Sequence, residues 1–412
     1  MRSEISEGGG RHPQKQGLRF PKPSPFRKYW GLAPKTVFLN HGSFGACPKA
    51  VLTVQMDFRR RMEAEPIEFL WRRYEKPLDR ARKALAKFVG ARAKDLVFVP
   101  NATTAVNAVV RSLELRPGDE LLTTGHDYNA CRNVLVEAAR RAGAKTVVAD
   151  VPFPLKTPED ILEAIMRAVT RRTRLAMIDH VSSHTALIFP TERVIRELDG
   201  RGVETLVDGA HAPGMVPLDI KRLRPAYYTG NLHKWVCAPK GAAFLWVRED
   251  KQDGLQPAVI SHGNNQMRSG YTRLQDRFDW PGTVDPSAKF SVADAIEWMG
   301  KLLPGGWKEV RQRNHELAVK ARQILCERWG TEPLCPEQML GSMATVRLPE
   351  RFQGRPLKGR FEEEQVRLYR DFGIEVPFLR IGNPAERYIR VSAQLYNAVG
   401  EYEYLAEALA MV

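Results

Sequence analysis

The sequence predicts an α/β protein with a mainly parallel central sheet flanked by helices, followed by a smaller C-terminal α+β domain. Two observations predict this fold class. From about residue 95, short runs rich in β-branched residues alternate with longer segments of helical period, which is the pattern of parallel strands joined by crossover helices. After residue 247 this alternation gives way to amphipathic helices mixed with a few strands.

The elements of the central sheet follow one another along the chain. Strands are expected at residues 96–100, 120–124, 145–149, 174–179, 204–208 and 242–247. Helices are expected between them at residues 104–115, 130–143, 158–171 and 191–202. In the third of these helices, Ile161, Ile165 and Val169 recur on one helical face. Ligands of such sheets lie at the carboxyl ends of the strands, so the residues that follow each strand are candidates for a site.

The C-terminal third is expected to form a separate unit. A Gly-, Asn- and Asp-rich region precedes a long amphipathic helix that begins near Pro286 and another that begins after Pro304. Strands are expected at residues 343–348 and 388–393. The 412 residues therefore divide into three expected parts: a basic N-terminal extension (1–34), a large domain (35–287, of which 35–60 can pack with the small domain) and a small α+β domain (288–412).

The composition excludes several classes of protein. With 43% hydrophobic and 27% charged residues, the chain lies near the average of soluble globular proteins and far from disordered, collagen-like or disulfide-rich chains. No stretch approaches the roughly 18 apolar residues of a transmembrane helix, and the N-terminus lacks the apolar stretch of a secretory signal. The five cysteines form no CxxC pair and have no histidine at zinc spacing, so we expect reduced thiols, no metal site and a cytoplasmic location.

The net charge of +15 points only weakly to an acidic partner. A large share of the excess lies in residues 1–30, where Lys and Arg outnumber Glu4 and Glu7. The other basic residues mostly alternate with acidic ones in helical runs, as on solvated helix faces. We therefore expect a small-molecule substrate, and neither a nucleic acid nor a membrane as partner.

Several common catalytic and nucleotide-binding motifs are absent from the sequence. It contains no GxGxxG after a strand, no GxxxxGK loop, no HExxH and no GxSxG. Polar residues nevertheless follow most of the expected strands: Thr103, Thr104, His126, Asp127, Tyr128, Ser183, His184, Asp208 and His211. Thr103 and Thr104 would open a helix whose amides and hydroxyls suit a phosphate, although, taken alone, an ordinary helix cap explains them better.

Lys234 carries the most informative chemical signal. It lies in a polar turn between two apolar strands. Its neighbours His233 and Trp235 would leave the amine partly desolvated, which suits a Schiff base, although a surface lysine is the competing explanation. With Asp208 it provides the two fixed points of a pyridoxal phosphate site, because the carboxylate keeps the pyridine nitrogen protonated and the lysine holds the aldehyde. The agreement of consecutive strand ends predicts pyridoxal 5'-phosphate as the cofactor.

Several short motifs resemble those of a known family: FLNHGSFGACP, NATTAVN, DYNA, DGAHAPG, GNLHKW, WPGTVDPSA and IRVSAQLYN. In residues and order they are similar to the class V aminotransferase family of fold type I pyridoxal phosphate enzymes. They are most similar to its isopenicillin N epimerase-like branch, over residues from about 36 to 398. The resemblance implies the fold type I transferase fold and a pyridoxal-phosphate-dependent reaction on an amino acid or an amino-acid-derived substrate.

The resemblance also implies roles around the cofactor. Lys234 would form the Schiff base and then carry the α-proton of the substrate, and Asp208 would pair with the pyridine nitrogen. His211 and Ser183 would reach the ring hydroxyl, although relatives often carry Asn at the Ser183 position. The residues implied to hold the phosphate are Ala102, Thr103, Thr104, Asn231 and His233.

For the residue that stacks on the ring, the resemblance points to Tyr128. Related cysteine desulfurases carry an aromatic residue ten positions after the glycine that opens this strand, and here these positions are Gly118 and Tyr128. His126 is the second choice. In similar enzymes the residues matching Gly282 and Thr283 reach the phosphate of the neighbouring subunit, which implies a homodimer with shared active sites.

The implied substrate contacts come from both ends of the chain. Arg390 matches the position that binds the substrate carboxylate, where a guanidinium can hold both oxygens through a planar pair of hydrogen bonds. A surface strand arginine is the competing explanation. Asn40 and His41 fall where the N-terminal segment of relatives folds over the substrate, and an ordinary turn competes with that role.

One departure from the family disfavours persulfide-forming desulfuration. Cysteine desulfurases need a nucleophilic cysteine shortly before the carboxylate-binding arginine, yet residues 372–389 contain no cysteine. Cys326 and Cys335 lie too far from Arg390 to be given that role. The cysteines are expected to be small buried apolar side chains.

Removal of the α-proton from the substrate leaves three outcomes open. Return of the proton on the opposite face gives an isopenicillin N epimerase-like epimerase or racemase, which we rank first, with Tyr128 or His41 as the second acid. Loss of a β-substituent gives a C–S lyase of cysteine or a cysteine-sulfoxide conjugate, the near alternative, and delivery of the proton to the cofactor gives an aminotransferase. A non-catalytic binding module of the same fold is the alternative of another class, and the intact Lys234, Asp208 and Arg390 argue against it.

Overall fold

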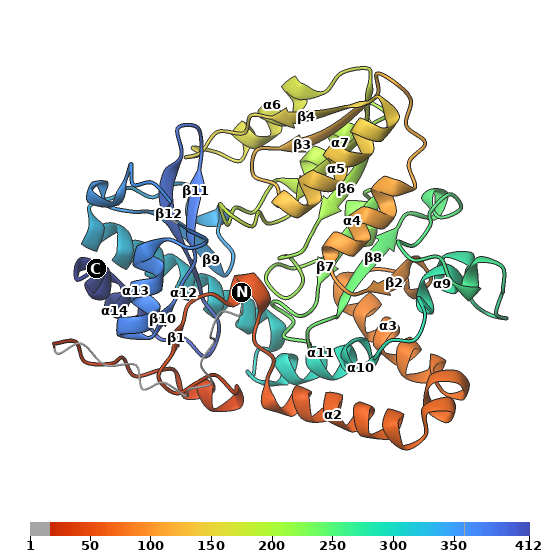
Figure 1. Ribbon diagram of the computed structural model, residues 1–412, viewed down its shortest axis with the longest axis horizontal. Helices are drawn as coiled ribbons and strands as arrows, with labels where there is room; N and C mark the ends of the chain where they lie inside the picture. The colour runs from red at the N-terminus through yellow and green to blue at the C-terminus, as the bar shows by residue number, and fades with distance from the viewer. Residues whose placement is uncertain (1–16, 358) are drawn as a thin grey trace.

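The computed structural model describes residues 17–357 and 359–412, so residues 1–16 of the expected extension lie outside the described part. Its centre is a seven-stranded sheet with the strand order β2-β8-β7-β6-β5-β3-β4 (Figure 1). The strands are β2 (Leu96–Val99), β3 (Glu120–Thr124), β4 (Lys145–Ala149), β5 (Thr173–Asp179), β6 (Glu204–Asp208), β7 (Tyr227–Asn231) and β8 (Ala243–Val247). All neighbours from β7 to β4 run parallel, whereas β8 is antiparallel to both of its neighbours. The predicted mainly parallel α/β fold is confirmed.

Helices cover both faces of this sheet, which explains why its strands are apolar runs. Side chains alternate between the faces along a strand. In β5, Leu175 and Met177 join one core cluster, which includes Val106 and Leu135 of α4 and α5, whereas Ile178 joins the cluster on the other face. The helices of this part are α2 (Lys49–Ala64), α3 (Glu75–Val89), α4 (Ala102–Arg111), α5 (Asn129–Ala142), α6 (Glu159–Ala168), α7 (Thr191–Asp199), α8 (Ile220–Leu223) and α9 (Arg273–Asp279).

The C-terminal part is built on a three-stranded antiparallel sheet in the order β11-β12-β9. These strands are β9 (Met343–Arg347), β11 (Phe378–Ile381) and β12 (Glu386–Ser392). The helices after residue 286 are α10 (Ser287–Phe290), α11 (Val292–Lys301), α12 (Gly306–Trp329), α13 (Glu363–Phe372) and α14 (Val399–Ala410). Of these, α10 and α11 pack against α2 and α3, whereas α12 and α14 pack together beside the small sheet (Figure 1). None of the helices in the described part is long and apolar enough to cross a membrane.

The segment before α2 belongs spatially to the C-terminal part. β1 (Val37–Phe38) pairs in parallel with β10 (Ile374–Glu375), and the one-turn helix α1 (His41–Phe44) follows it. Figure 1 shows β1 and β10 side by side below β12. The division of the chain into domains at residues 287 and 288 stays a prediction.

The expected helices of the large part are present with ends shifted by up to four residues, and two differences have a clear physical cause. α4 starts at Ala102 instead of residue 104, because the Asn101 side chain accepts a hydrogen bond from the Thr104 amide and caps the helix. The single helix expected near Pro286 is divided into α10 and α11 at Ser291, whose hydroxyl bonds back to the Ser287 carbonyl.

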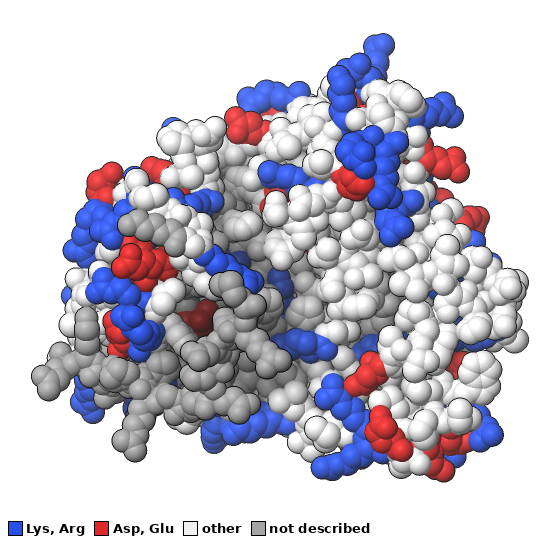
Figure 2. Space-filling view, viewed as in Figure 1, with Lys and Arg blue, Asp and Glu red and all other residues white. Residues whose placement is uncertain are grey.

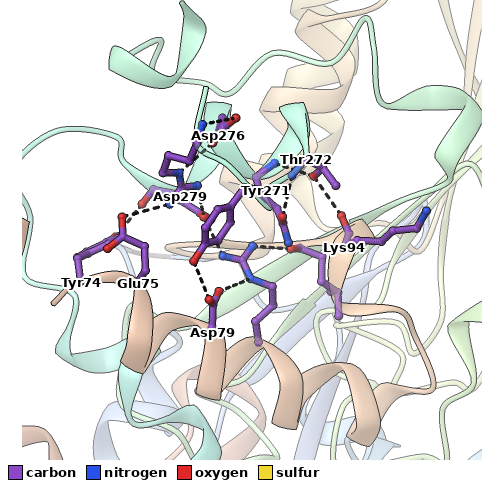
Figure 3. A network of polar contacts seen from close by, with 12 residues as sticks. Tyr74, Glu75, Asp79, Lys94, Tyr271, Thr272, Asp276 and Asp279 are labelled. Carbon is purple, nitrogen blue, oxygen red and sulfur yellow. Dashed lines mark hydrogen bonds and ion pairs between the residues drawn. The ribbon is translucent and has the colours of Figure 1, made fainter. Parts of the chain in front are cut away.

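A buried ion pair joins α3 to α9. Arg82 donates from Nη2 to Asp279 at 2.8 Å, and both side chains are 2% exposed. Asp279 also accepts from Arg268 at 2.7 Å. Figure 3 shows Asp276 and Asp279 gathered with residues of α3 in one polar network. Asp279 is the last residue of α9, so the network fixes the start of the segment that contains Gly282 and Thr283.

We expect Asp279→Ala to destabilise the fold by about 3 kcal/mol, because it removes the close, buried carboxylate partner of Arg82 and leaves only the more distant and more exposed Asp79 at 3.7 Å. Asp294→Ala is the matched control. Asp294 of α11 pairs with Arg80, which lies in α3 like Arg82, but these side chains are 23% and 49% exposed. This control should cost about 1 kcal/mol or less. Urea unfolding followed by circular dichroism measures both losses, and equal losses would contradict the role given to the buried pair.

Candidate active site

A cavity of about 780 Å³ lies at the carboxyl ends of the parallel strands, and Pro377, Leu379 and Arg390 of the C-terminal part close one side of it. Figure 2 shows the surface hollowed between the C-terminal elements and the large sheet, with Lys and Arg side chains in the hollow. The expected site residues that line the cavity are Ala102, Thr103, Thr104, Tyr128, Ser183, Asp208, His211, Asn231, His233, Lys234 and Arg390. The fold therefore brings most of the expected residues to one place.

Lys234 follows β7 and contacts a histidine. Its Nζ lies 2.8 Å from His211 Nε2. Trp235 donates from its indole nitrogen to His211 Nδ1 at 3.4 Å, so the ring hydrogen of His211 lies on Nε2. Because Nε2–H can donate only to an amine with a free lone pair, this contact favours the uncharged form of Lys234.

The surroundings of Lys234 favour the same form. Burial, the largest cause, and the positive charge of Arg390 lower the pKa of Lys234 to about 7, against the opposing effect of Asp208. A substantial fraction of the amine is therefore uncharged near neutral pH. An uncharged amine is the form that attacks a carbonyl or accepts a proton.

Two carboxyl groups lie side by side at the bottom of the cavity. Asp179 and Asp208 end the neighbouring strands β5 and β6 and are partners in their register. Asp208 accepts hydrogen bonds from the Ala210 amide at 2.9 Å and from the Cys131 thiol at 3.4 Å. Asp179 is 4% exposed, and its Oδ2 has no hydrogen-bond partner among the described residues. Burial and the charge of Asp208 raise the pKa of Asp179 well above its usual value, so Asp179 is the member of the pair that favours a proton.

Arg390 in β12 is a buried guanidinium that faces the same cavity and is 3% exposed. Its Nη1 donates to the Ser183 carbonyl at 2.5 Å, and its Nη2 donates to the Ser43 hydroxyl at 3.0 Å. Both acceptors are neutral, and Nε has no hydrogen-bond partner within the described residues. Burial lowers the pKa of Arg390 to about 10, so it stays charged at neutral pH. A buried cation with neutral partners is suited to the carboxylate of a ligand.

The N-terminus of α4 provides donors for an anion. Asn231 Oδ1 accepts from the Ala102 amide at 2.9 Å, so the NH₂ group of Asn231 is left for another acceptor. The Thr103 amide has no acceptor in the described part of the chain. His233 donates from Nδ1 to the Ala242 carbonyl at 3.2 Å, so Nε2 of the neutral ring is an acceptor and the phosphate contact expected of His233 stays a prediction. Free donors at the positive end of a helix dipole fit a phosphate group.

These groups together fit pyridoxal phosphate. That cofactor needs a lysine amine for its aldehyde, a carboxylate for its ring nitrogen and donors for its phosphate. Lys234, Asp208 and the start of α4 provide them around one cavity. The ring of Tyr128 lines the same cavity and is 45% exposed, so its face is available for stacking.

The structure places His41 elsewhere than expected. It is fully buried behind Lys234, with Nδ1 2.8 Å from the Tyr396 hydroxyl and Nε2 3.0 Å from the Lys234 carbonyl oxygen. It is not part of the cavity wall. Because both ring nitrogens are engaged, this position does not support the substrate contact or the acid role expected of His41. Asn40 is also absent from the wall, and its Oδ1 lies 3.5 Å from Arg390 Nη2, so it supports the arginine instead.

Other expected residues also lie away from this cavity. Gly282 and Thr283 follow α9 and are not part of the wall, and their contact with a neighbouring subunit stays a prediction. His126, the second choice for stacking, is buried and bonded to the Thr185 hydroxyl at 2.8 Å.

Sequence reasoning missed Asp179, Cys131 and Ser43, the last of which lines the cavity and accepts from Arg390. Asp179 is the last residue of an expected strand, and counting the last residue of each strand together with those that follow would have found it. Cys131 carries no signal of its own, because its contact with Asp208 depends on how α5 packs against the sheet.

The chain is similar to known proteins over most of its length. A family model for aminotransferase class-V matches residues 38–404. The chain is 36% identical to isopenicillin N epimerase of Amycolatopsis lactamdurans over 397 residues, which cover 93% of this chain and 96% of that protein. It is 31% identical to putative L-cysteine desulfhydrase 1 of Oryza sativa subsp. japonica over 405 residues, or 90% and 82% of the two chains. The crystal structure of the cysteine desulfurase CsdA from Escherichia coli has the same fold, with a TM-score of 0.75 at 20% identity and coverage of 94% and 97%.

We expect Asp179→Asn to stabilise the cofactor-free protein more at about pH 8 than at about pH 5. A carboxyl whose pKa is raised by folding contributes stability below its unfolded pKa, and this contribution is lost as the pH rises through the folded pKa. The asparagine variant does not suffer this loss. Thermal unfolding at the two pH values measures the difference, and a stability change that is the same at both values would contradict the raised pKa.

Proposed function

The chain belongs to the aminotransferase class-V family, and on that premise we propose that it is a pyridoxal-phosphate-dependent enzyme that removes the α-proton of an amino acid or amino-acid-derived substrate. The observation that supports this most is that the Lys234 amine and the Arg390 guanidinium line one cavity with Asp208. An α-amino acid carries its amine and its carboxylate on one carbon, so its site needs a group for each at close range.

The residues of the cavity would hold the cofactor as follows. Asp208 would bind the ring nitrogen, His211 and Ser183 the ring hydroxyl, and Tyr128 one face of the ring. The start of α4 with Asn231 would bind the phosphate. When bound, the cofactor supplies an electron sink that stabilises negative charge at the α-carbon of the substrate.

The protein itself would orient the substrate and move its proton. Arg390 would hold the two carboxylate oxygens, which fixes the direction of the α-hydrogen. Lys234 Nζ would take that proton, since a pKa of about 7 makes it a usable base at neutral pH. Burial and the charge of Lys234 lower the pKa of His211 well below its usual value, so this histidine adds no further charge beside the amine.

We rank epimerisation first among the possible outcomes. It needs a proton donor on each face of the α-carbon. Lys234 follows β7 and Tyr128 follows β3, and these strands lie on opposite sides of β6 and β5 in the sheet. The strands that carry them therefore end on opposite sides of Asp208 along the sheet edge, and both side chains line the cavity. Tyr128 would be the second acid, and the similarity to isopenicillin N epimerase supports this order.

A C–S lyase is the second candidate. Within the described residues that line the cavity, Arg390 is the single guanidinium, which suits a substrate with one carboxylate, such as cysteine or a cysteine-sulfoxide conjugate. Tyr128 would then protonate the leaving sulfur. The similarity to L-cysteine desulfhydrases supports this candidate. Transamination would use the same Lys234 without a role for Tyr128.

Incubation with pyridoxal phosphate and a panel of L- and D-amino acids in heavy water should introduce deuterium at the α-carbon, as mass spectrometry of the recovered substrate would show. The opposite enantiomer identifies an epimerase, pyruvate a lyase and the intact 2-oxo acid an aminotransferase. Tyr128→Phe should reduce net turnover about 100-fold or more while α-deuteration by Lys234 continues, because only the second acid is lost.

Lys234→Ala is the matched control, since it should lose both α-deuteration and turnover. A wild-type protein that gains no visible absorbance and no deuterium would contradict the proposed function and favour the non-catalytic binding module. Undiminished turnover in Tyr128→Phe would exclude Tyr128 as the acid and leave transamination as the better explanation.

We also propose a homodimer with shared active sites. Large apolar side chains are exposed on and near the segment before Gly282: Trp71 (67%), Ile260 (63%) and Met267 (77%). Trp71 lines a pocket of about 310 Å³ together with Trp280. Exposed apolar groups of this kind mark interaction surfaces. A second copy that covers them would also bring Gly282 and Thr283 to the neighbouring cavity.

Mixed dimers test this arrangement. Lys234→Ala and Thr283→Glu should each be inactive, the latter because a carboxylate repels the phosphate. If Thr283 serves the neighbouring site, random reassociation of the two variants should restore about a quarter of the wild-type activity, because half of the dimers are mixed and each has one intact site. A mixture that stays inactive although sedimentation detects dimers would show that the sites are not shared.

A further inference from the structure

His41 connects two distant parts of the chain to the turn between β7 and β8 that contains Lys234 (residues 232–242, the lysine turn). It is fully buried, and its Nε2 lies 3.0 Å from the main-chain carbonyl oxygen of Lys234. On its other side, Nδ1 lies 2.8 Å from the hydroxyl of Tyr396. The rings of His41 and Trp235 pack together with their centres 4.8 Å apart. The imidazole therefore contacts the main chain of Lys234 and the side chain of the residue that follows it.

The partners of His41 determine its tautomer. The Ala46 amide donates to Nδ1 at 3.3 Å, so Nδ1 carries no hydrogen. The Lys234 carbonyl can only accept, so the hydrogen lies on Nε2 and is donated to it. Burial lowers the pKa of His41 to about 3, so this neutral tautomer persists across the working pH range. His41 is thus a fixed donor and not a group that exchanges protons.

The chain around His41 is built closely onto the lysine turn. Gly45 has a φ of +70°, and a Cβ on it would lie 2.0 Å from the His233 carbonyl oxygen. Lys240 donates to the Gly45 carbonyl at 2.9 Å from the other end of the turn. The same short segment reaches Arg390 through the Ser43 hydroxyl at 3.0 Å. One segment therefore contacts both the lysine turn and the guanidinium.

We propose that His41 is a positioning residue, which holds the main chain of Lys234 and thereby sets the place of its amine relative to Arg390. The catalytic meaning of this role depends on the proposed function. The positioning itself is a property of the cofactor-free chain and can be tested without turnover.

The place of the Lys234 amine can be measured through its acid–base behaviour. The titratable and charged groups that face it come from several elements: Arg390 of β12, Asp208 of β6, Asp179 of β5, Cys131 of α5, and His211 and His233 of the adjoining turns. None of these is changed by a substitution at His41. A shift in the titration of Lys234 then reports a change in its position, because burial is the main cause of its lowered pKa.

The experiment is a brief acetylation of the cofactor-free full-length protein at a series of pH values, with mass spectrometry of the peptide that contains Lys234. Half-maximal labelling of the wild type is expected near the pKa of about 7. His41→Leu, which removes the donor, should let the turn relax and move the pH of half-maximal labelling upward by about one unit. At a fixed pH below that midpoint, this shift corresponds to about tenfold less labelling.

Conservative variants separate positioning from a merely structural effect. His41→Gln keeps an N–H near the position of Nε2, so its pH midpoint should lie close to that of the wild type. Tyr396→Phe removes only the hydroxyl that contacts His41 Nδ1, so it should shift the pH midpoint upward by less. His180→Leu is the matched control, because His180 is also buried with Nδ1 2.8 Å from a tyrosine hydroxyl, that of Tyr228, but does not contact Lys234.

The proposal is overturned if His41→Leu, folded by circular dichroism, titrates like the wild type, or if His180→Leu shifts the midpoint as much. If His41→Leu fails to fold, Tyr396→Phe decides: an upward shift supports the proposal and an unchanged midpoint overturns it. With pyridoxal phosphate added, the pH midpoint of the visible absorbance should shift in the same variants. A wild type that binds no pyridoxal phosphate would contradict the proposed function, whereas the labelling result would still decide the role of His41.

Discussion

The burial of two cations in one cavity governs the chemistry of this site. Lys234 and Arg390 are both almost inaccessible to solvent, and the charge of the arginine opposes the charge of the lysine. Even with a pKa lowered to about 10, Arg390 keeps its proton at neutral pH. Lys234 is therefore the group that loses its proton more easily. Burial beside a guanidinium turns an ordinary lysine into an amine that can be neutral.

The fold produces this arrangement through the parallel sheet. Strands buried on both faces leave little freedom to the main chain, so the residues at their carboxyl ends are placed accurately. Asp179 and Asp208 enter from β5 and β6, and Lys234 follows β7, so the carboxyl groups and the amine meet at one edge. The guanidinium comes from the other sheet, on β12, and its position depends on the segment from Asn40 to Gly45 that contacts both parts of the molecule.

The sequence predicts the parts of this site that depend on local pattern. Strand periodicity and burial are local properties, so the strand ends and the residues after them could be identified, among them Asp208 and Lys234. The motif around His41 is local and predicts a substrate contact, yet the ring is held by Tyr396, which lies 355 positions away. The contact of Cys131 with Asp208 is also non-local, because it joins residues 77 positions apart. The pairing of β1 with β10 joins residues more than 300 positions apart, and no periodicity within either segment encodes it.

A bound substrate would alter the charge balance at the moment when proton transfer needs it. A carboxylate on Arg390 would cancel much of the guanidinium charge, which is, after burial, the main cause that lowers the pKa of Lys234. Its cancellation would raise that pKa, which makes the uncharged amine a stronger base and leaves a smaller fraction of the amine uncharged at neutral pH. A ligand without a carboxylate would leave Lys234 the weaker base that it is in the free protein. If Arg390 orients the substrate as proposed, it would therefore also control the base, and selectivity for α-amino acids would follow from electrostatics as well as from shape.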